Sequence, residues 1–203
     1  MSTDKPTPEN PPDDMTALPG AGDKLFDIAV GRPAVASSFS RKQDWHFYIN
    51  GYKDAADFLL DHGGTEVDFR KVGYPILFLY RQHLELVLKD LIRDCRRFLG
   101  WDEAFPKTHR IDELWRLCLN LLQEISPGMC DNEEIQHTTR LLTEFCKVDP
   151  TSEAFRYPED KDGNPPRFDV DIDLSRVKGV VGKISLLVDC ISTHISTLKD
   201  DAF

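Results

Sequence analysis

The sequence predicts an all-α protein, a bundle of four or five helices that follows a disordered N-terminal tail. Apolar residues recur at spacings of three and four residues through five stretches between residues 43 and 199. The apolar–polar alternation of a β-strand occurs nowhere at comparable length. Helix-stopping residues, such as Gly63-Gly64 and Ser126-Pro127-Gly128, separate the stretches.

The first two predicted helices cover residues 43–61 and 74–99. Aromatic and small apolar residues mark one face of the first, which stops at Gly63-Gly64: Trp45, Tyr48, Tyr52, Ala55, Ala56 and Leu59. The second is the longest unbroken pattern and is predicted to be the central helix. It carries a nearly heptad seam: Leu77, Tyr80, Leu84, Leu88, Leu91, Cys95 and Phe98.

The remaining helices are predicted over residues 109–125, 131–145 and 173–199. The fourth helix is expected to begin at Asp131, which stands three residues before Glu134 in a capping-box spacing. Between the fourth and fifth helices lies a connection over residues 149–168 with four prolines and the run Phe155-Arg156-Tyr157. Because a solvated loop gains nothing from two aromatic residues, we expect this loop to fold back over the bundle.

Residues 1–40 are predicted to be a disordered or strap-like tail, and residues 41–203 the helical-bundle domain. Six of the 13 prolines fall in this tail, among small and acidic residues that cannot form a packed face. A few apolar residues could still dock on the domain as a strap: Leu25, Phe26, Ile28 and Val30. A chain of 203 residues suffices for one core but not for two full domains.

Composition narrows the classes of function. A net charge of −10 disfavours a general nucleic-acid coat protein and a binder of anionic membranes, so any nucleic-acid site must be a local basic patch. The five cysteines form no C-x-x-C pair, and no apolar stretch follows a basic start. No run approaches the ~18 apolar residues of a membrane span. The sequence predicts a reduced, cytoplasmic protein with no membrane contact.

A charged stripe runs along the second helix. At 100° per residue, Arg81 points toward the core, and Glu85 and Lys89 follow at the next two turns. Two interpretations are open: a structural ion pair that fixes helix register, or a polar site between helices that His109, Arg156 or Asp160 approaches. In either case Arg81 is expected to pair with Glu85 or with an acid of the 149–168 loop. His83, on another side of the same helix, is interpreted as a surface residue or a second-face contact.

No histidine has a companion at metal-ligand spacing, and no phosphate-cradling glycine loop is present, so neither a metal nor a cofactor is predicted. Basic residues form one flank of the second helix and continue beyond it. They form either a solvated charged face or a binding site for phosphate groups. The candidate nucleic-acid-binding residues are Lys89, Arg93, Arg96, Arg97 and Arg110.

The stretch Tyr74-Pro75-Ile76-Leu77-Phe78-Leu79-Tyr80-Arg81, continued by Glu85, Lys89 and His109, resembles the paired central helices of HEPN-like proteins. The resemblance covers residues 43 to 200. It implies a four-helix core, frequent dimerisation, and association with RNA cleavage, toxin–antitoxin pairs or phage defence. Active members carry Arg, four to six residues, then His on a late helix. In this chain Arg176 and His194 are too distant for that pattern, and Arg41 and His46 match its spacing only ahead of the first helix.

Two functions follow as expectations. The first is a HEPN-like, metal-independent ribonuclease that acts on or binds RNA or a nucleotide, with candidate catalytic residues Arg81, Glu85, His109, Arg156 and Tyr157. The second is a catalytically inactive HEPN-like module that binds a protein partner or antitoxin; a structural scaffold is a third, weaker alternative. The heptad-like seams and the resemblance both suggest a homodimer.

Overall fold

A computed structural model describes residues 18, 45–62, 68–102, 104–166 and 171–200. All the described helices belong to one compact unit, Gln43–Phe203. The tail and strap predicted over residues 1–40 lie outside the described residues, apart from Leu18.

The prediction of an all-α fold is confirmed: the described residues form five α-helices and one short 3₁₀ turn, with no strand. In chain order these elements are α1 (Trp45–Asp61), α2 (Phe69–Phe98), α3 (Ile111–Ile125), η1 (Met129–Asp131), α4 (Glu133–Val148) and α5 (Leu174–Asp200).

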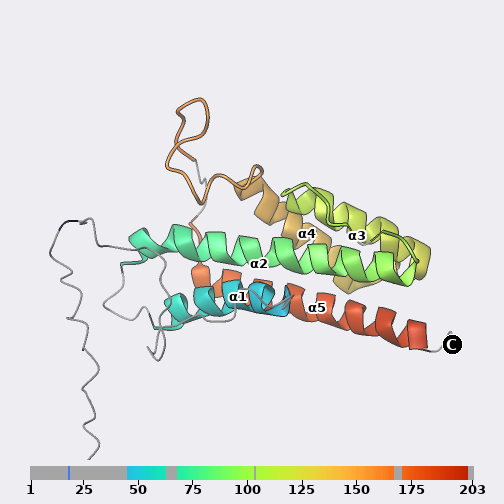
Figure 1. Cartoon of the computed structure of the whole chain (residues 1–203). Coiled ribbons are helices and arrows are strands. Elements are labelled where there is room, and N and C mark those ends of the chain that lie inside the picture. Colours follow the sequence, from blue (N-terminus) through green and yellow to red (C-terminus); the bar gives the residue numbers. More distant parts are fainter. Residues whose placement is uncertain (1–17, 19–44, 63–67, 103, 167–170, 201–203) are drawn as a thin grey trace, which may run out of the picture. The chain divides into compact units, whose positions relative to one another are not determined.

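Helix α2 is the central element, as its long seam predicted. It packs against α1, α3 and α5, and α4 contacts α3 and α5 (Figure 1). In Figure 1, α3 and α4 lie on one side of α2, and α1 and α5 on the other. A helix covered on two sides must be apolar around much of its circumference. Accordingly, its side chains with no exposed surface point in several directions: Ile76, Tyr80, Leu84, Leu88, Leu91, Ile92 and Cys95.

Helix α2 begins at Phe69, five residues earlier than predicted, so that Pro75 lies inside it. Proline inside a helix removes one backbone hydrogen bond, which here belongs to the carbonyl of Lys71. Lys71 is exposed, and water can reach that carbonyl. Tertiary packing favours the extra turn, since Val72 packs on the core and the backbone at Gly73 is so close to α5 that an added Cβ would lie 3.9 Å from the Leu174 side chain.

Helix α4 begins two residues later than predicted. Asp131 belongs to the 3₁₀ turn, and Asn132 is the N-cap, its side-chain oxygen accepting the Glu134 backbone N–H at 2.8 Å. Asparagine caps helices as well as aspartate does, and the turn that precedes it displaces Asp131 from the capping position.

Of the two interpretations of His83, the second-face contact is confirmed and the surface residue is wrong, because the face of α2 that carries it is covered by α1 and α5. The His83 side chain is buried, with Nδ1 2.9 Å from the Ile49 carbonyl of α1 and Nε2 2.6 Å from the Ser185 hydroxyl of α5. Since a carbonyl only accepts, Nδ1–H donates to Ile49. In the neutral ring Nε2 accepts, so the single hydroxyl proton of Ser185 goes to the ring and not to the Val181 carbonyl 2.9 Å away. His83 therefore joins three helices as a neutral group.

Stability is expected to fall as the pH drops below about 6.5, the ordinary pKa of histidine. Burial lowers the pKa of His83, and nearby Lys53 adds to this, while the hydrogen bond to Ile49 and the charges of Asp189 and Asp57 oppose it. Below pH 6.5 the unfolded chain therefore binds the proton first, and the free energy of unfolding falls until the folded-state pKa is reached. The slope is at most about 1.4 kcal/mol per pH unit. Urea unfolding of the wild type and of His83→Gln between pH 7.5 and 5 measures it, and equal slopes in the two proteins would contradict the prediction.

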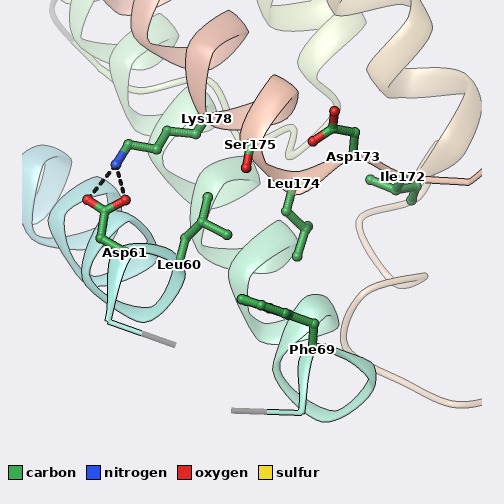
Figure 2. A pocket seen from close by; sticks show the side chains of 8 residues that line it. All are labelled: Leu60, Asp61, Phe69, Ile172, Asp173, Leu174, Ser175 and Lys178. Atoms are coloured by element: carbon green, nitrogen blue, oxygen red, sulfur yellow. Dashed lines mark hydrogen bonds and ion pairs between the residues drawn. The ribbon is translucent and has the colours of Figure 1, made fainter. Parts of the chain in front are cut away.

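The first turns of α2 and α5 meet the last turn of α1. Figure 2 shows Lys178 of α5 reaching Asp61 of α1, with Nζ 2.6 Å from both carboxylate oxygens.

By length and composition alone, Leu174–Lys199 could cross a membrane, which is weak evidence because core helices of soluble proteins pass the same criterion. In this structure one face of α5 contributes Val181, Ile184, Val188, Ile191 and Ile195 to the core.

Candidate functional site

The charged stripe on α2 forms the ion pairs that its spacing predicted. Arg81 Nη1 lies 3.3 Å from Glu85 Oε2, and Lys89 Nζ lies 2.9 Å from Glu85 Oε1. The Arg81 and Glu85 side chains are 1% and 2% exposed. Burying an unpaired ion costs several kcal/mol, so each charge in this stripe depends on its neighbours.

Asp149 completes the buried cluster. Arg81 Nε lies 2.8 Å from Asp149 Oδ2, at ion-pair distance but without the angle of a hydrogen bond, and the other carboxylate oxygen accepts the Ala154 backbone N–H at 3.1 Å. The prediction that Arg81 pairs with Glu85 or with a loop acid is therefore confirmed for both partners. Asp149 itself was not singled out from the sequence. The available signal is Pro150, which disfavours helix at the residue before it and so places Asp149 at the end of α4.

His109 stands at the surface end of this cluster. Its Nδ1 lies 2.8 Å from Glu85 Oε1, and its main-chain oxygen accepts a 2.8 Å hydrogen bond from Arg81 Nη2. A carboxylate only accepts, so Nδ1 carries the proton and donates it to Glu85. The side chain is 70% exposed, and Nε2 has no hydrogen-bond partner among the described residues. The ring is thus held from its buried side and open on the other.

The residues around His109 fix the chain just before α3. That helix begins at Ile111, two residues later than predicted, so His109 precedes it. The Thr108 hydroxyl accepts the Arg110 backbone N–H at 3.1 Å and donates to Glu113 at 2.6 Å. The carboxylates of Asp112 and Glu113, in the first turn of α3, interact favourably with the positive end of the helix dipole. Both also pair with the Arg110 side chain.

The connection that carries His109 runs back along α2. Arg96 donates to the Ala104 carbonyl, and the Arg93 guanidinium lies 5.6 Å from the ring centroids of both Phe105 and Trp45, which stack on each other. These contacts lie one and two turns beyond Lys89 on the same helix. Helix α2 therefore holds the connection that carries His109 at three points along its length, through Glu85, Arg93 and Arg96.

Each candidate nucleic-acid-binding residue has a local partner. Lys89 contacts Glu85, Arg93 contacts Asp90, and Arg97 contacts Asp94 at 3.2 Å. Arg96 donates to a backbone carbonyl, and Arg110 pairs with two acids of α3. A phosphate would have to compete with these partners, so the phosphate-binding site stays a prediction.

The expectation that the loop after α4 folds back over the bundle is confirmed only for its first residues, because residues 156–165 are exposed and the loop extends away from the helices (Figure 1). The cation of this loop does not join the cluster. Phe155 is buried and lies edge-on to Phe145 of α4, with ring centroids 6.0 Å apart. Arg156 Nε donates to the Ser152 carbonyl, and its guanidinium lies 5.4 Å from the Tyr157 ring. Within the described part of the chain, neither Arg156 nor Tyr157 contacts Arg81, Glu85 or His109 through a hydrogen bond or ion pair.

Asp160 also lies apart from the cluster. Its carboxylate closes a local turn by accepting the backbone N–H groups of Asp162 and Asn164, at 2.9 and 2.8 Å. The described residues contain no group of three or more His, Cys, Asp and Glu side chains placed to hold a metal ion.

Cys146 of α4 lies near the start of α3. Burial raises the pKa of its thiol and the nearby Asp112 carboxylate adds to this, while the Asp112 backbone N–H and the charges of Arg81 and Arg110 oppose them. Because burial is the largest of these effects, the thiol is kept protonated and unreactive.

The site that emerges is an imidazole oriented by a buried carboxylate, with its second nitrogen directed away from that carboxylate. Such a ring can take a proton and return it. Arg81 is too deeply buried to meet a ligand in this conformation and acts on the main chain of His109 instead.

Comparison of the chain with protein-family models, curated proteins and solved structures finds no match in any of the three.

Proposed function

We propose that this protein is a HEPN-like helical bundle that binds and cleaves RNA without a metal ion, with His109 as the proton-transfer group. The observation that supports this most directly is the Glu85–His109 pair, in which one imidazole nitrogen is held at 2.8 Å by a buried carboxylate and the other has no partner among the described residues. A general base needs this arrangement, since its orientation and tautomer must be fixed before the substrate arrives.

The reaction follows from the chemistry of RNA. His109 Nε2 takes the proton from a ribose 2′-hydroxyl, and the 2′-oxygen forms a bond to the adjacent phosphorus. The bond from phosphorus to the 5′-oxygen breaks, and this oxygen leaves with a proton from solvent. The products are a 2′,3′-cyclic phosphate and a 5′-hydroxyl end, and no oxidant or metal is consumed.

The buried cations give Glu85 a supporting role in this proposal. Arg81 and Lys89 both contact its carboxylate, at 3.3 and 2.9 Å, and compensate its negative charge in the buried cluster. An ionised Glu85 orients the ring and stabilises the imidazolium that forms when His109 accepts a proton, as carboxylates do in other catalytic pairs. Glu85 and Arg81 are then positioning residues, and His109 is the group that touches the substrate.

A pair of matched oligonucleotides tests the proposal. Purified protein with EDTA is expected to cleave a mixed-sequence RNA and to leave the DNA of the same sequence intact, because DNA lacks the 2′-hydroxyl nucleophile. Gel analysis of the products, including the cyclic phosphate end, provides the measurement. Cleavage that requires added Mg²⁺, or equal cleavage of DNA, would overturn the mechanism.

A second candidate function, a catalytically inactive HEPN-like module that binds a protein partner or antitoxin, is favoured by a different surface. Large apolar side chains are exposed on α1 and α5, with exposed fractions of 55 to 72%: Phe47, Tyr48, Phe58 and Leu186. Helices α1 and α5 contact each other, and exposed apolar side chains on adjacent helices can form a protein interaction site. The absence of cleavage in the experiment above, together with no binding of the same RNA in a titration, would favour this candidate.

A further inference from the structure

A cavity of about 310 Å³ lies between the start of α2 and the loop after α4. Besides Ala154 and Phe155, its walls come from two tyrosines, one arginine and three prolines: Tyr74, Arg156, Tyr157, Pro158, Pro165 and Pro166. Among the described residues, no aspartate or glutamate lines it. The cavity in Figure 2, by contrast, is lined by Asp61 and Asp173 as well as Lys178. In a chain with a net charge of −10, a cavity with one cation and no carboxylate in its lining is suited to an anion.

Arg156 is held so that part of its guanidinium stays available. Its Nε donates to the Ser152 carbonyl at 2.6 Å, which fixes the side chain, and its guanidinium lies 5.4 Å from the Tyr157 ring centroid. The two terminal nitrogens have no hydrogen-bond partner among the described residues. Their N–H groups form the fork that recognises a phosphate or carboxylate with two parallel hydrogen bonds.

The walls of the cavity are flat and apolar. Tyr157 is 55% exposed and Tyr74 is 44% exposed, and the proline rings add further apolar surface. Aromatic rings exposed beside an arginine are the usual platform for an unstacked base, because every base presents a π-face. The volume falls at the lower end of the range of small-molecule sites, about 300–1,000 Å³, which suits one nucleotide better than several.

We propose that this cavity binds one nucleoside monophosphate unit, with the phosphate on the terminal nitrogens of Arg156 and the base against Tyr157 and Tyr74. The inference does not depend on the ribonuclease proposal, because none of these side chains belongs to the Glu85–His109 pair. The unit could be a free mononucleotide or one nucleotide of an RNA strand, and the two sources share the same chemistry.

Titration calorimetry distinguishes the sources and tests the site. The probes are AMP, CMP, GMP and UMP, inorganic phosphate, and a short RNA strand, each added to the wild-type protein. We expect a mononucleotide or the strand to bind at least tenfold more tightly than phosphate, because stacking adds to the charge contact. Binding of mononucleotides indicates a free ligand, and binding of the strand alone indicates RNA.

Variants then assign the binding to this cavity. Arg156→Gln and Tyr157→Leu are each expected to weaken binding about tenfold or more, and Arg156→Lys should weaken it as well because lysine lacks the fork. Arg140→Gln on α4, outside the cavity lining, is the matched control and should bind as the wild type does. Thermal unfolding verifies that each variant is folded. No binding by any nucleotide probe, affinity equal to that for phosphate, or binding unchanged in both Arg156→Gln and Tyr157→Leu would overturn the proposal. If the site fails while His109-dependent cleavage persists, the proposed function stands.

Discussion

Arg81→Ala is expected to lower the free energy of unfolding by about 3–5 kcal/mol, the range for removing one partner of a buried ion pair. The substitution leaves two buried carboxylates, Glu85 and Asp149, without their shared cation, and it leaves the His109 carbonyl without its donor. Urea unfolding at constant pH and salt measures the change, provided that the dependence on denaturant concentration is the same as in the wild type.

A surface pair of the same type is the control. Arg140 and Glu144 on α4 are 2.6 Å apart, but their side chains are 60% and 57% exposed, so solvent screens them. Arg140→Ala should therefore cost no more than about 1 kcal/mol. A similarly small loss for Arg81→Ala would mean that the cluster contributes little to folding, and would contradict the ion-pair interpretation.

A double substitution separates the two acids. Asp149→Asn in the Arg81→Ala background should cost less than Asp149→Asn in the wild type, because the carboxylate that it removes is by then unpaired. Equal costs in the two backgrounds would show that Arg81 and Asp149 are energetically independent despite their 2.8 Å separation.

The inward direction of Arg81 could be predicted from the sequence because it depends only on the period of one helix. At 100° per residue, the Leu77–Cys95 seam fixes where Arg81, Glu85 and Lys89 point, whichever helices cover that face. The positions of the five helices follow from the same local rule, and their ends are within a few residues of the predicted ones except at Phe69. There, packing of Val72 on the core offsets the backbone hydrogen bond that Pro75 removes.

Contacts between distant segments could not be predicted in the same way. The Arg81–Asp149 pair joins residues 68 positions apart, and periodicity does not say which end of which helix closes that distance. The sequence could not choose between the two interpretations of His83 for a related reason: the pattern of α2 does not reveal that α1 and α5 cover its second face. Arg156 was expected near His109 because it lacked another role, whereas its hydrogen bond to Ser152 is a local feature of the loop.

His109→Ala is expected to reduce RNA cleavage by about 10²–10⁴-fold, the usual contribution of a general base, while leaving the protein folded. The reason for the second expectation is geometric: Arg81 donates to the main-chain oxygen of His109, which alanine retains. Glu85 loses one hydrogen-bond donor but keeps Arg81 and Lys89, so the stability cost should be close to that of a single hydrogen bond, about 1 kcal/mol.

Measuring cleavage rate and unfolding free energy on the same preparations separates catalysis from structure. His137→Ala is the matched control, because His137 is exposed on α4 and has no hydrogen-bond partner among the described residues. It should change neither quantity. If His109→Ala were as unstable as Arg81→Ala, its loss of activity would follow from unfolding and the imidazole would have no demonstrated role. If His109→Ala stayed folded and still cleaved RNA at the wild-type rate, the proton would have to be moved by another group, and His109 would be part of the ion-pair cluster that anchors the connection to α2.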